Sequence, residues 1–181
     1  MMASHISSLI KCRRAAAAAE MAMVTPLLIA LMFGSFELGN YFLSEHVVVK
    51  AVRDGARYAG RLGFSNYSCV DDDDGNIPGG TVVADTRNLV RTGQLTGGSA
   101  RLVGWTDPET IKVTYDCVDP HSVTPSYSGI YNSMSYVPVV KVEIATDNAN
   151  RLVYQSLFNR LGFDSSALYL NAASQSPVTG L

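Results

Sequence analysis

The chain has 181 residues, of which 47% are hydrophobic and 17% are charged, and its formal net charge is -2. This length allows one domain with an appended segment. Phosphate binding needs clustered Lys and Arg side chains, and the basic residues after Arg61 are scattered, so the composition excludes nucleic acid as a partner.

An uncharged apolar run lies near the N-terminus. It extends from Met21 to Phe36, and at about 1.5 Å per residue it covers roughly 24 Å of the roughly 30 Å of bilayer hydrocarbon. A run from Ala16 to about Leu38 is long enough to cross the membrane, but it includes the carboxylate of Glu20. The sequence therefore predicts a membrane span that contains a glutamate.

The residues before this run predict its orientation and its processing. The N-terminal tail is expected in the cytoplasm and the chain after about Leu43 outside, because basic residues and no acidic ones precede the run: Lys11, Arg13 and Arg14. The small residues Ala15–Ala19 come before the apolar run, whereas an ordinary secretory signal has its small-residue cleavage site after it. The apolar segment is therefore expected to remain in the mature protein.

A specific residue pattern runs from Arg13 to Gly60. Its positions are Arg13, Arg14, Glu20, Pro26, Phe33, Gly34, Glu37, Gly39, Ala51, Arg53, Gly55, Ala56, Arg57, Tyr58 and Ala59. This pattern resembles the N-terminal region of the TadE-like proteins of tight-adherence (Tad/Flp) pilus systems. The start of the pattern resembles the signal of type IV pilins and pseudopilins, which implies a prepilin peptidase that cuts between Ala15 and Ala16. Ala15 stands where that family usually has glycine.

The resemblance gives Glu20 and the new N-terminus a role in assembly. The α-amino group of Ala16 is expected to be largely cationic, since the unperturbed pKa of such a group is about 7.7–8.0. In pilins, the glutamate at this position pairs with the N-terminal amine of a neighbouring subunit and fixes the axial register. The alternative is that Glu20 lies at the cytoplasmic headgroups and only complements the helix macrodipole.

Two other positions in the run have structural interpretations. Glu37 lies near the outer end and is expected in the membrane interface. Pro26 has no amide to bond to the carbonyl of Ala22, so a bend in the helix is expected there.

The span continues as an amphipathic helix. Residues recur every three or four positions on its apolar face: Val48, Val52, Gly55, Ala59 and Leu62. The opposite face carries Lys50, Arg53, Asp54, Arg57 and Arg61. A helix over 16–62 that ends at Gly63 is predicted, and its apolar face must be buried against the C-terminal part of the chain.

A loop over 66–81 contains an acidic run, Asp71–Asp74. The run does not match a calcium-binding loop, because Val70 occupies the first ligand position. A solvated acidic loop is the favoured interpretation, with calcium binding as the alternative.

The rest of the chain predicts a mixture of helices and strands. A short helix is expected to begin at Asp85 or Thr86 and to end at Gly93. A further helix is expected over 148–163. Alternating apolar residues predict three strands, namely Thr110–Cys117, Tyr136–Thr146 and Ser166–Ser174. Pro138 is expected at the start of the second strand or on an edge.

The cysteines agree with this topology. Cys12 lies in the cytoplasmic tail, whereas Cys69 and Cys117 lie beyond the span. These two are expected to form a disulfide in an oxidising compartment, and the alternative is two unpaired buried thiols.

No pattern of catalytic or metal-binding residues emerges. The histidines are far apart in the sequence, at His5, His46 and His121, so spacing suggests neither a metal site nor a Cys/His dyad. We therefore expect no enzymatic activity, no metal and no cofactor.

These observations predict an α+β protein with a long N-terminal helix packed on a small, mostly antiparallel sheet. Its parts are a cytoplasmic leader (1–15), a transmembrane and amphipathic helix (16–62) and an extracytoplasmic domain (63–181). The resemblance implies a minor pilin or pseudopilin of the inner membrane, with the C-terminal domain in the periplasm or in the extracellular pilus. Its expected partners are other Tad/Flp pilins and pseudopilins, a prepilin peptidase, the inner-membrane assembly platform and the lipid bilayer. The alternative is an uncleaved single-pass protein whose outer domain binds a ligand.

Overall fold

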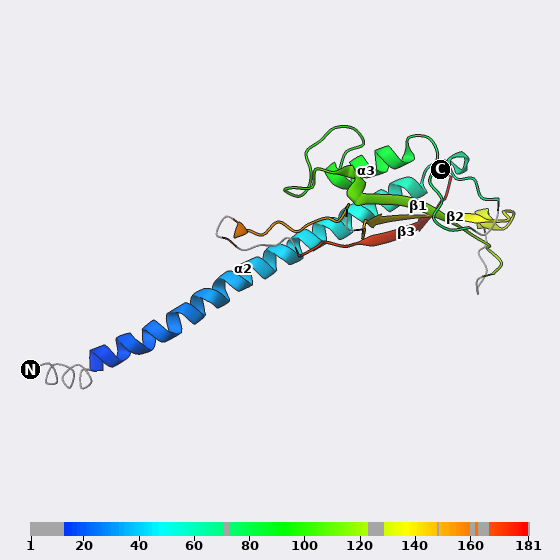
Figure 1. The fold of residues 1–181 in the computed structure, drawn as a ribbon. Coiled ribbons are helices and arrows are strands. Elements are labelled where there is room, and N and C mark those ends of the chain that lie inside the picture. Colours follow the sequence, from blue (N-terminus) through cyan, green and yellow to red (C-terminus); the bar gives the residue numbers. More distant parts are fainter. Residues whose placement is uncertain are drawn as a thin grey trace, which may run out of the picture. The chain divides into compact units, whose positions relative to one another are not determined.

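The computed structural model describes residues 13–70, 73–122, 129–147, 149–159, 162 and 167–180, with side chains from residue 17 onward. The chain divides into two compact units, Met1–Asn40 and Tyr41–Leu181. Both include part of one helix, α2 (Arg13–Gly60), which is coloured from blue to cyan in Figure 1. Helix α2 begins in a run of alanines, the strongest helix formers, and it continues through Pro26 without interruption.

Helix α2 ends two residues earlier than predicted. Turn bonds from the amides of Arg61 and Leu62 to the carbonyls of Tyr58 and Ala59 follow its last residue. Gly63 does not cap α2, because its backbone is extended (φ -60°, ψ 145°) and it begins the 3₁₀ turn η1 (Phe64–Asn66). The prediction of a Gly63 cap was therefore wrong.

The outer unit contains a three-stranded antiparallel sheet. Its strands β1 (Ile111–Val118), β2 (Val137–Ile144) and β3 (Ala173–Pro177) lie in the order β1-β2-β3. The register pairs Val113 with Val142 and Val140 with Ser176. Burial alternates along β1, which confirms the predicted inner face of Ile111, Val113, Tyr115 and Cys117. The α+β fold is thereby confirmed.

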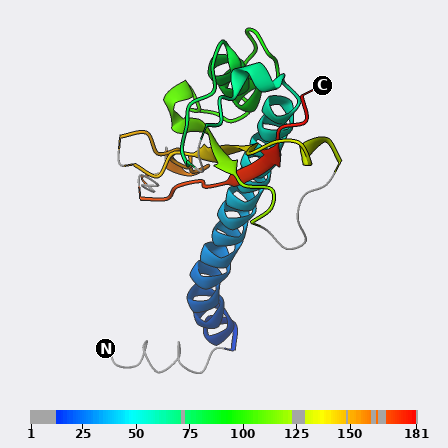
Figure 2. The same cartoon turned by 90° about the vertical axis from the view of Figure 1, so that its right-hand side faces the viewer.

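The sheet covers the apolar face of the outer half of α2. Fully or almost fully buried residues of this face are Val48, Ala51, Val52, Ala56 and Ala59. Figures 1 and 2 both show the sheet beside this part of the helix. The absence of a side chain at Gly60 permits close approach, since a Cβ there would lie 2.6 Å from Ser176 Oγ. The sheet and the helix therefore share one core.

A second helix, α3 (Val82–Thr92), packs against α2 at Gly55. A Cβ on Gly55 would overlap Val90 Cγ2 and lie 3.3 Å from Thr86 Cγ2. Helix α3 ends as predicted at Gly93, which has a left-handed backbone (φ 83°), but it begins earlier than predicted, after Thr81. The carboxylate of Asp85 accepts a hydrogen bond of 2.6 Å from the Thr81 hydroxyl.

Two buried aromatic side chains donate hydrogen bonds inside the core. Trp105 is fully buried, and its indole N–H donates to Thr110 Oγ1 at 2.7 Å, beside the short 3₁₀ turn η2 (Pro108–Thr110). Tyr67 is 4% exposed, and its hydroxyl donates to the carbonyl of Ala59 at 2.7 Å. Burial raises the pKa of Tyr67 to about 12, because the ionised phenolate is poorly solvated there.

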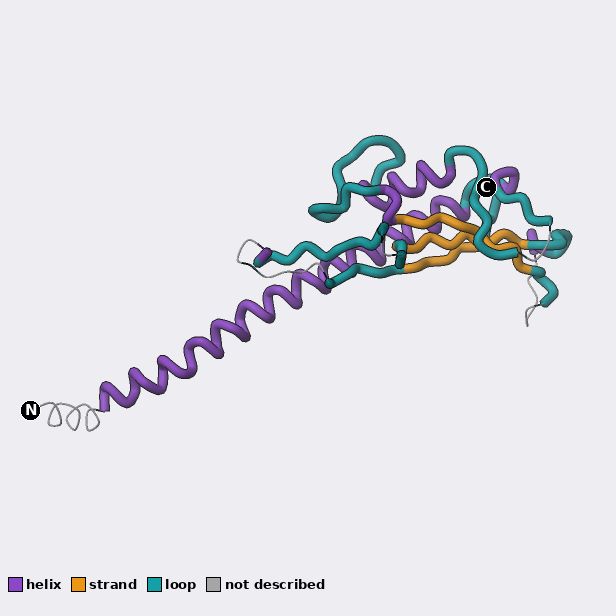
Figure 3. The backbone as a smooth tube through the Cα atoms, viewed as in Figure 1, coloured by secondary structure: helices purple, strands orange, loops and turns teal. Residues whose placement is uncertain are grey.

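The segment before β3 differs most from its prediction. The described part of 148–163 forms no α-helix, and Val153 instead makes an isolated antiparallel bridge with Tyr169. Figure 3 draws the described part of the connection between β2 and β3 mostly as loop. Strand β3 begins at Ala173, so the predicted strand over 166–174 was mostly wrong in position. A further short turn, η3 (Gly129–Tyr131), precedes β2.

Candidate functional site

All described residues of the N-terminal unit belong to α2, and its apolar side chains point outward. The large exposed ones are Met21, Met23, Val24, Leu27, Leu28, Ile29, Leu31, Met32, Phe33, Phe36 and Leu38. A helix that is apolar on all sides is typical of a membrane span or a buried core. Among the described residues, one helix, Ala17–Gly60, contains a stretch long and apolar enough to cross a membrane by length and composition.

The hydroxyl groups of this segment bond to its own backbone. Thr25 Oγ1 donates to the carbonyl of Met21 at 2.6 Å, and Ser35 Oγ donates to the carbonyl of Leu31 at 2.7 Å. Such bonds let a polar side chain enter hydrocarbon without an unsatisfied donor. The bend expected at Pro26 stays a prediction.

The expected processing and assembly residues lie at the start of α2. Ala15 and Ala16 are helical, and their side chains fall outside the described part of the structure. Glu20 is exposed and forms no ion pair with any side chain described from residue 17 onward. A protein cation that pairs with Glu20 must therefore come from the residues before 17 or from another molecule.

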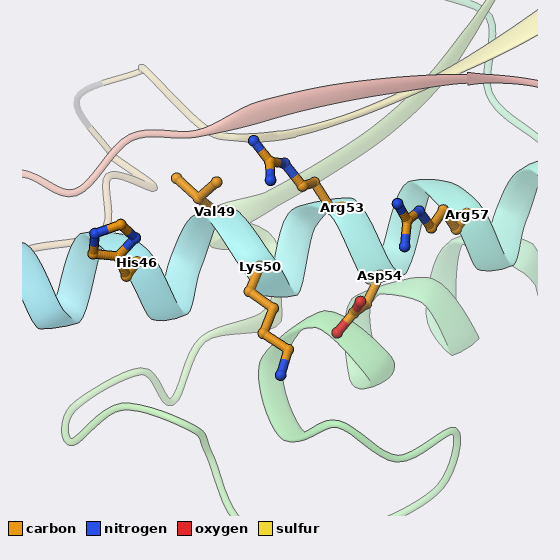
Figure 4. Close-up of a pocket in the computed structure, with 6 residues that line it drawn as sticks. All are labelled: His46, Val49, Lys50, Arg53, Asp54 and Arg57. Carbon is orange, nitrogen blue, oxygen red and sulfur yellow. The ribbon is translucent and has the colours of Figure 1, made fainter.

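The outer half of α2 presents a polar face to solvent. A depression of about 430 Å³ is lined by His46, Val49, Lys50, Arg53, Asp54 and Arg57. Figure 4 shows Lys50 and Asp54 pointing to one flank of the helix and Arg53 to the other. The predicted face of Lys50, Arg53 and Arg57 is confirmed as exposed, whereas the depression that it lines was not predicted.

The disulfide expected between Cys69 and Cys117 is present, with a Cα–Cα distance of 5.6 Å. It joins the segment after α2 to the end of β1. The acidic segment is held at the same place, because the amide of Cys117 donates to the carbonyl of Asp73 at 2.7 Å and the amide of Gly75 to Asp116 Oδ1 at 2.8 Å. Asp71 and Asp72 lie outside the described residues. No group of three or more potential metal-ligating side chains is found in the described part of the chain.

A helix that contains a stretch apolar enough to cross a membrane, and whose outer half packs on a small antiparallel sheet, defines the class of this α+β protein. Residues 15–57 match the family model of TadE-like proteins. This match confirms the TadE-like resemblance and covers the apolar helix and most of its amphipathic continuation. Neither the curated proteins nor the solved structures gave a match.

Proposed function

We propose that this protein is a minor pilin or pseudopilin of a Tad/Flp-type adhesive pilus, a structural component without enzymatic activity. The match of residues 15–57 to TadE-like proteins is the observation that carries the proposal. That segment contains the predicted cleavage site, Glu20 and the apolar helix. In this role the helix holds the subunit in the inner membrane and then packs among the helices of other pilus components.

The leader is proposed to be removed between Ala15 and Ala16 by a prepilin peptidase. Cleavage creates an α-amino group four residues before Glu20. The basic residues before Ala15, which keep the leader in the cytoplasm, are lost in the same step. The mature chain then begins directly with the helical segment.

Glu20 is proposed to pair with the Ala16 amine of a neighbouring subunit. An ionised carboxylate at the centre of a membrane helix costs about 2.5–3.5 kcal/mol, and less near the edge. A cationic amine offsets this cost only when the two helices are in the correct axial register. The exposed position of Glu20, with no cation among the side chains described from residue 17 onward, supports a partner outside that part of the chain.

The outer unit is proposed to lie in the periplasm or on the assembled pilus. The disulfide between Cys69 and Cys117 supports this location, because disulfides persist in oxidising compartments. The other Tad/Flp pilins and the inner-membrane assembly platform are the proposed partners.

Two measurements test the proposal. The intact mass of the protein from native cells is expected to correspond to a chain that begins at Ala16, and Glu20→Gln is expected to abolish pilus formation. Met21→Leu, which changes the adjacent residue without changing charge, is the matched control and should leave pili normal.

The two parts of the proposal can fail separately. A mature chain that begins at Met1 or Met2 would refute processing. Normal piliation by the Glu20→Gln variant would refute the assembly role and favour an uncleaved membrane protein with a ligand-binding outer domain.

A further inference from the structure

Four cations of the outer unit are neutralised by ion pairs within the described part of the chain. The ion pairs are Arg87 with Glu109, Arg101 with Asp54, Lys112 with Asp147 and Lys141 with Glu143. Two other guanidinium groups donate to backbone carbonyls, namely Arg91 to Thr106 and Arg151 to Thr146. Among the Lys and Arg side chains that the structure describes, those with no hydrogen bond or ion pair are Lys50, Arg53, Arg57 and Arg61.

These four residues, here called the basic row, lie on the exposed face of the outer half of α2 and its last turn, with Lys50 and Arg53 pointing to opposite flanks of that face (Figure 4). All four are exposed, and their spacings of three, four and four residues align them along the helix. At about 1.5 Å per residue the row is roughly 16 Å long. Three members of the row, Lys50, Arg53 and Arg57, line the depression described above, and Figure 4 shows their side chains.

The basic row keeps its positive charge in the isolated chain. The carboxylate that lies within it, Asp54, is paired with Arg101 at 3.6 Å and so is shared with a cation outside the row. Like charges one helical turn apart, such as Arg53 and Arg57, destabilise a helix. A row of unpaired cations is therefore a surface that gains from an acidic partner.

The same chain carries a complementary surface, here called the acidic end, which consists of Asp73, Asp74 and Asp119. Asp73 and Asp74 are exposed, Asp119 is half-buried, and none of the three forms an ion pair with a described cation. The acidic end is fixed in place by the disulfide to Cys117 and by the bond from the amide of Cys117 to the carbonyl of Asp73. The backbone that carries these carboxylates is therefore held to the end of β1.

The two surfaces lie on different parts of the outer unit. The acidic end lies beyond the last residues of β1, whereas the basic row lies on the side of α2 away from the buried face of Val48 and Val52. No ion pair joins them within the chain. Within the described part of the chain, the two surfaces therefore do not neutralise each other.

We propose that the basic row binds the acidic end of a second copy of this chain. Because two different surfaces meet, the contact is head-to-tail and builds an open chain of subunits rather than a closed dimer. The contact lies in the outer unit, so it goes beyond the role of Glu20 and does not depend on removal of the leader.

Self-association of the full chain in neutral detergent micelles tests this proposal. Sedimentation velocity is expected to give a mass that grows with protein concentration at 50 mM NaCl, and an association constant at least roughly tenfold lower at 500 mM NaCl, because salt screens exposed charges. The variants Arg53→Glu with Arg57→Glu, and Asp73→Lys with Asp74→Lys, are each expected to lose at least roughly tenfold in association. An equimolar mixture of the two variants is expected to associate again, since each then carries the complement of the other.

Matched variants and a second measurement complete the test. Arg53→Lys with Arg57→Lys preserves the charge and should associate like the wild type, as should Val103→Glu, which adds a negative charge at a side chain that is 89% exposed. If a charge-reversed variant does not fold, a zero-length carbodiimide crosslink in a mixture of ¹⁴N- and ¹⁵N-labelled wild type should join Lys50 of one copy to Asp73 or Asp74 of another.

Several results would overturn the proposal. These are a wild type that stays monomeric at low salt, folded reversed variants that associate like the wild type, and a mixture that does not recover. Binding of anionic vesicles through Arg53 and Arg57, without self-association, would identify the basic row as a lipid-binding surface instead. A wild type that does not self-associate, but that is processed normally and forms Glu20-dependent pili, would refute this contact and leave the proposed function intact.

Discussion

The contact between α2 and α3 predicts that Gly55→Ala destabilises the outer unit. In an ordinary helix this substitution is stabilising by about 1 kcal/mol, because alanine is the better helix former. At Gly55, however, the added methyl group overlaps Val90 Cγ2 and approaches Thr86 Cγ2 to 3.3 Å and Val142 Cγ1 to 3.7 Å. The methyl group therefore has no free space on the side where α3 and β2 meet α2.

The overlap outweighs the gain in helix propensity. Val90 is fully buried in a helix, where valine has essentially one side-chain rotamer, so it cannot turn away at low cost. Overpacking of this kind costs about 1–3 kcal/mol, and the tight contacts favour the upper part of that range. The net loss in free energy of unfolding is then about 1–2 kcal/mol, which lowers the melting temperature of a unit of this size by about 2–8 °C.

Thermal and urea unfolding in detergent micelles measures this loss. Trp105 is the single tryptophan and is fully buried, so its fluorescence follows the outer unit. Gly63→Ala is the matched control, since its φ of -60° suits any residue and the nearest atom to the new Cβ is 3.6 Å away; it should be neutral or slightly stabilising. Adding Val90→Ala to Gly55→Ala should relieve the overlap, with a coupling energy of about 1 kcal/mol in a double-mutant cycle. A Gly55→Ala variant as stable as the wild type, or a coupling energy of zero, would refute the packing argument.

Three further predictions concern the outer unit. Replacing both Cys69 and Cys117 by alanine should lower the free energy of unfolding by about 4 kcal/mol on the chain-entropy estimate for a separation of 48 residues, and urea unfolding should detect it. The pKa of Tyr67 is raised to about 12, so on raising the pH this side chain ionises first in the unfolded chain. Its contribution to the free energy of unfolding is fully present below pH 10 and is lost between about pH 10 and 12. In Tyr67→Phe, the alkaline titration of tyrosinate absorbance should lack the group that titrates near 12. Thr110→Val should cost about 1–3 kcal/mol, because the indole N–H of Trp105 is left without an acceptor, and Thr110→Ser should retain most of the stability. Unchanged unfolding curves in the two denaturation experiments, or an unchanged alkaline titration in the third, would contradict these arguments.

Periodicity predicted the parts of the fold in which one face is buried. The three- and four-residue spacing of Val48, Val52 and Ala59 identified the face of α2 that packs under the sheet. The two-residue alternation from Ile111 to Cys117 identified β1 and its inner face. In both cases local conformation and burial follow from the same pattern, so sequence alone was sufficient.

The segment over 148–163 could not be predicted in this way. Its sequence predicts a helix, but the described part of the segment is an extended connection in which Leu152 and Tyr154 are buried. Backbone bonds between Tyr154 and Leu168 and between Leu170 and Leu152 replace those of a helix. These bonds join parts of the chain that are distant in sequence, and no local pattern encodes them.

The basic face of α2 was predicted, but its lack of internal partners was not. Charge and spacing place Lys50, Arg53 and Arg57 together on the helix. Whether these cations are neutralised depends on which cations the acidic side chains pair with in the folded chain. Asp54 pairs with Arg101 and Glu143 with Lys141, and the sequence alone does not give these pairs.

Because α2 supplies one wall of the core, the apolar face of the sheet depends on this helix to cover it. The helix precedes all three strands in the chain, so during synthesis the template is complete before the first strand leaves the ribosome. A polypeptide that started after Leu62 would present the apolar side of β1 and β2 to water and would aggregate. The apolar stretch and the folding scaffold are consecutive parts of a single helix, α2.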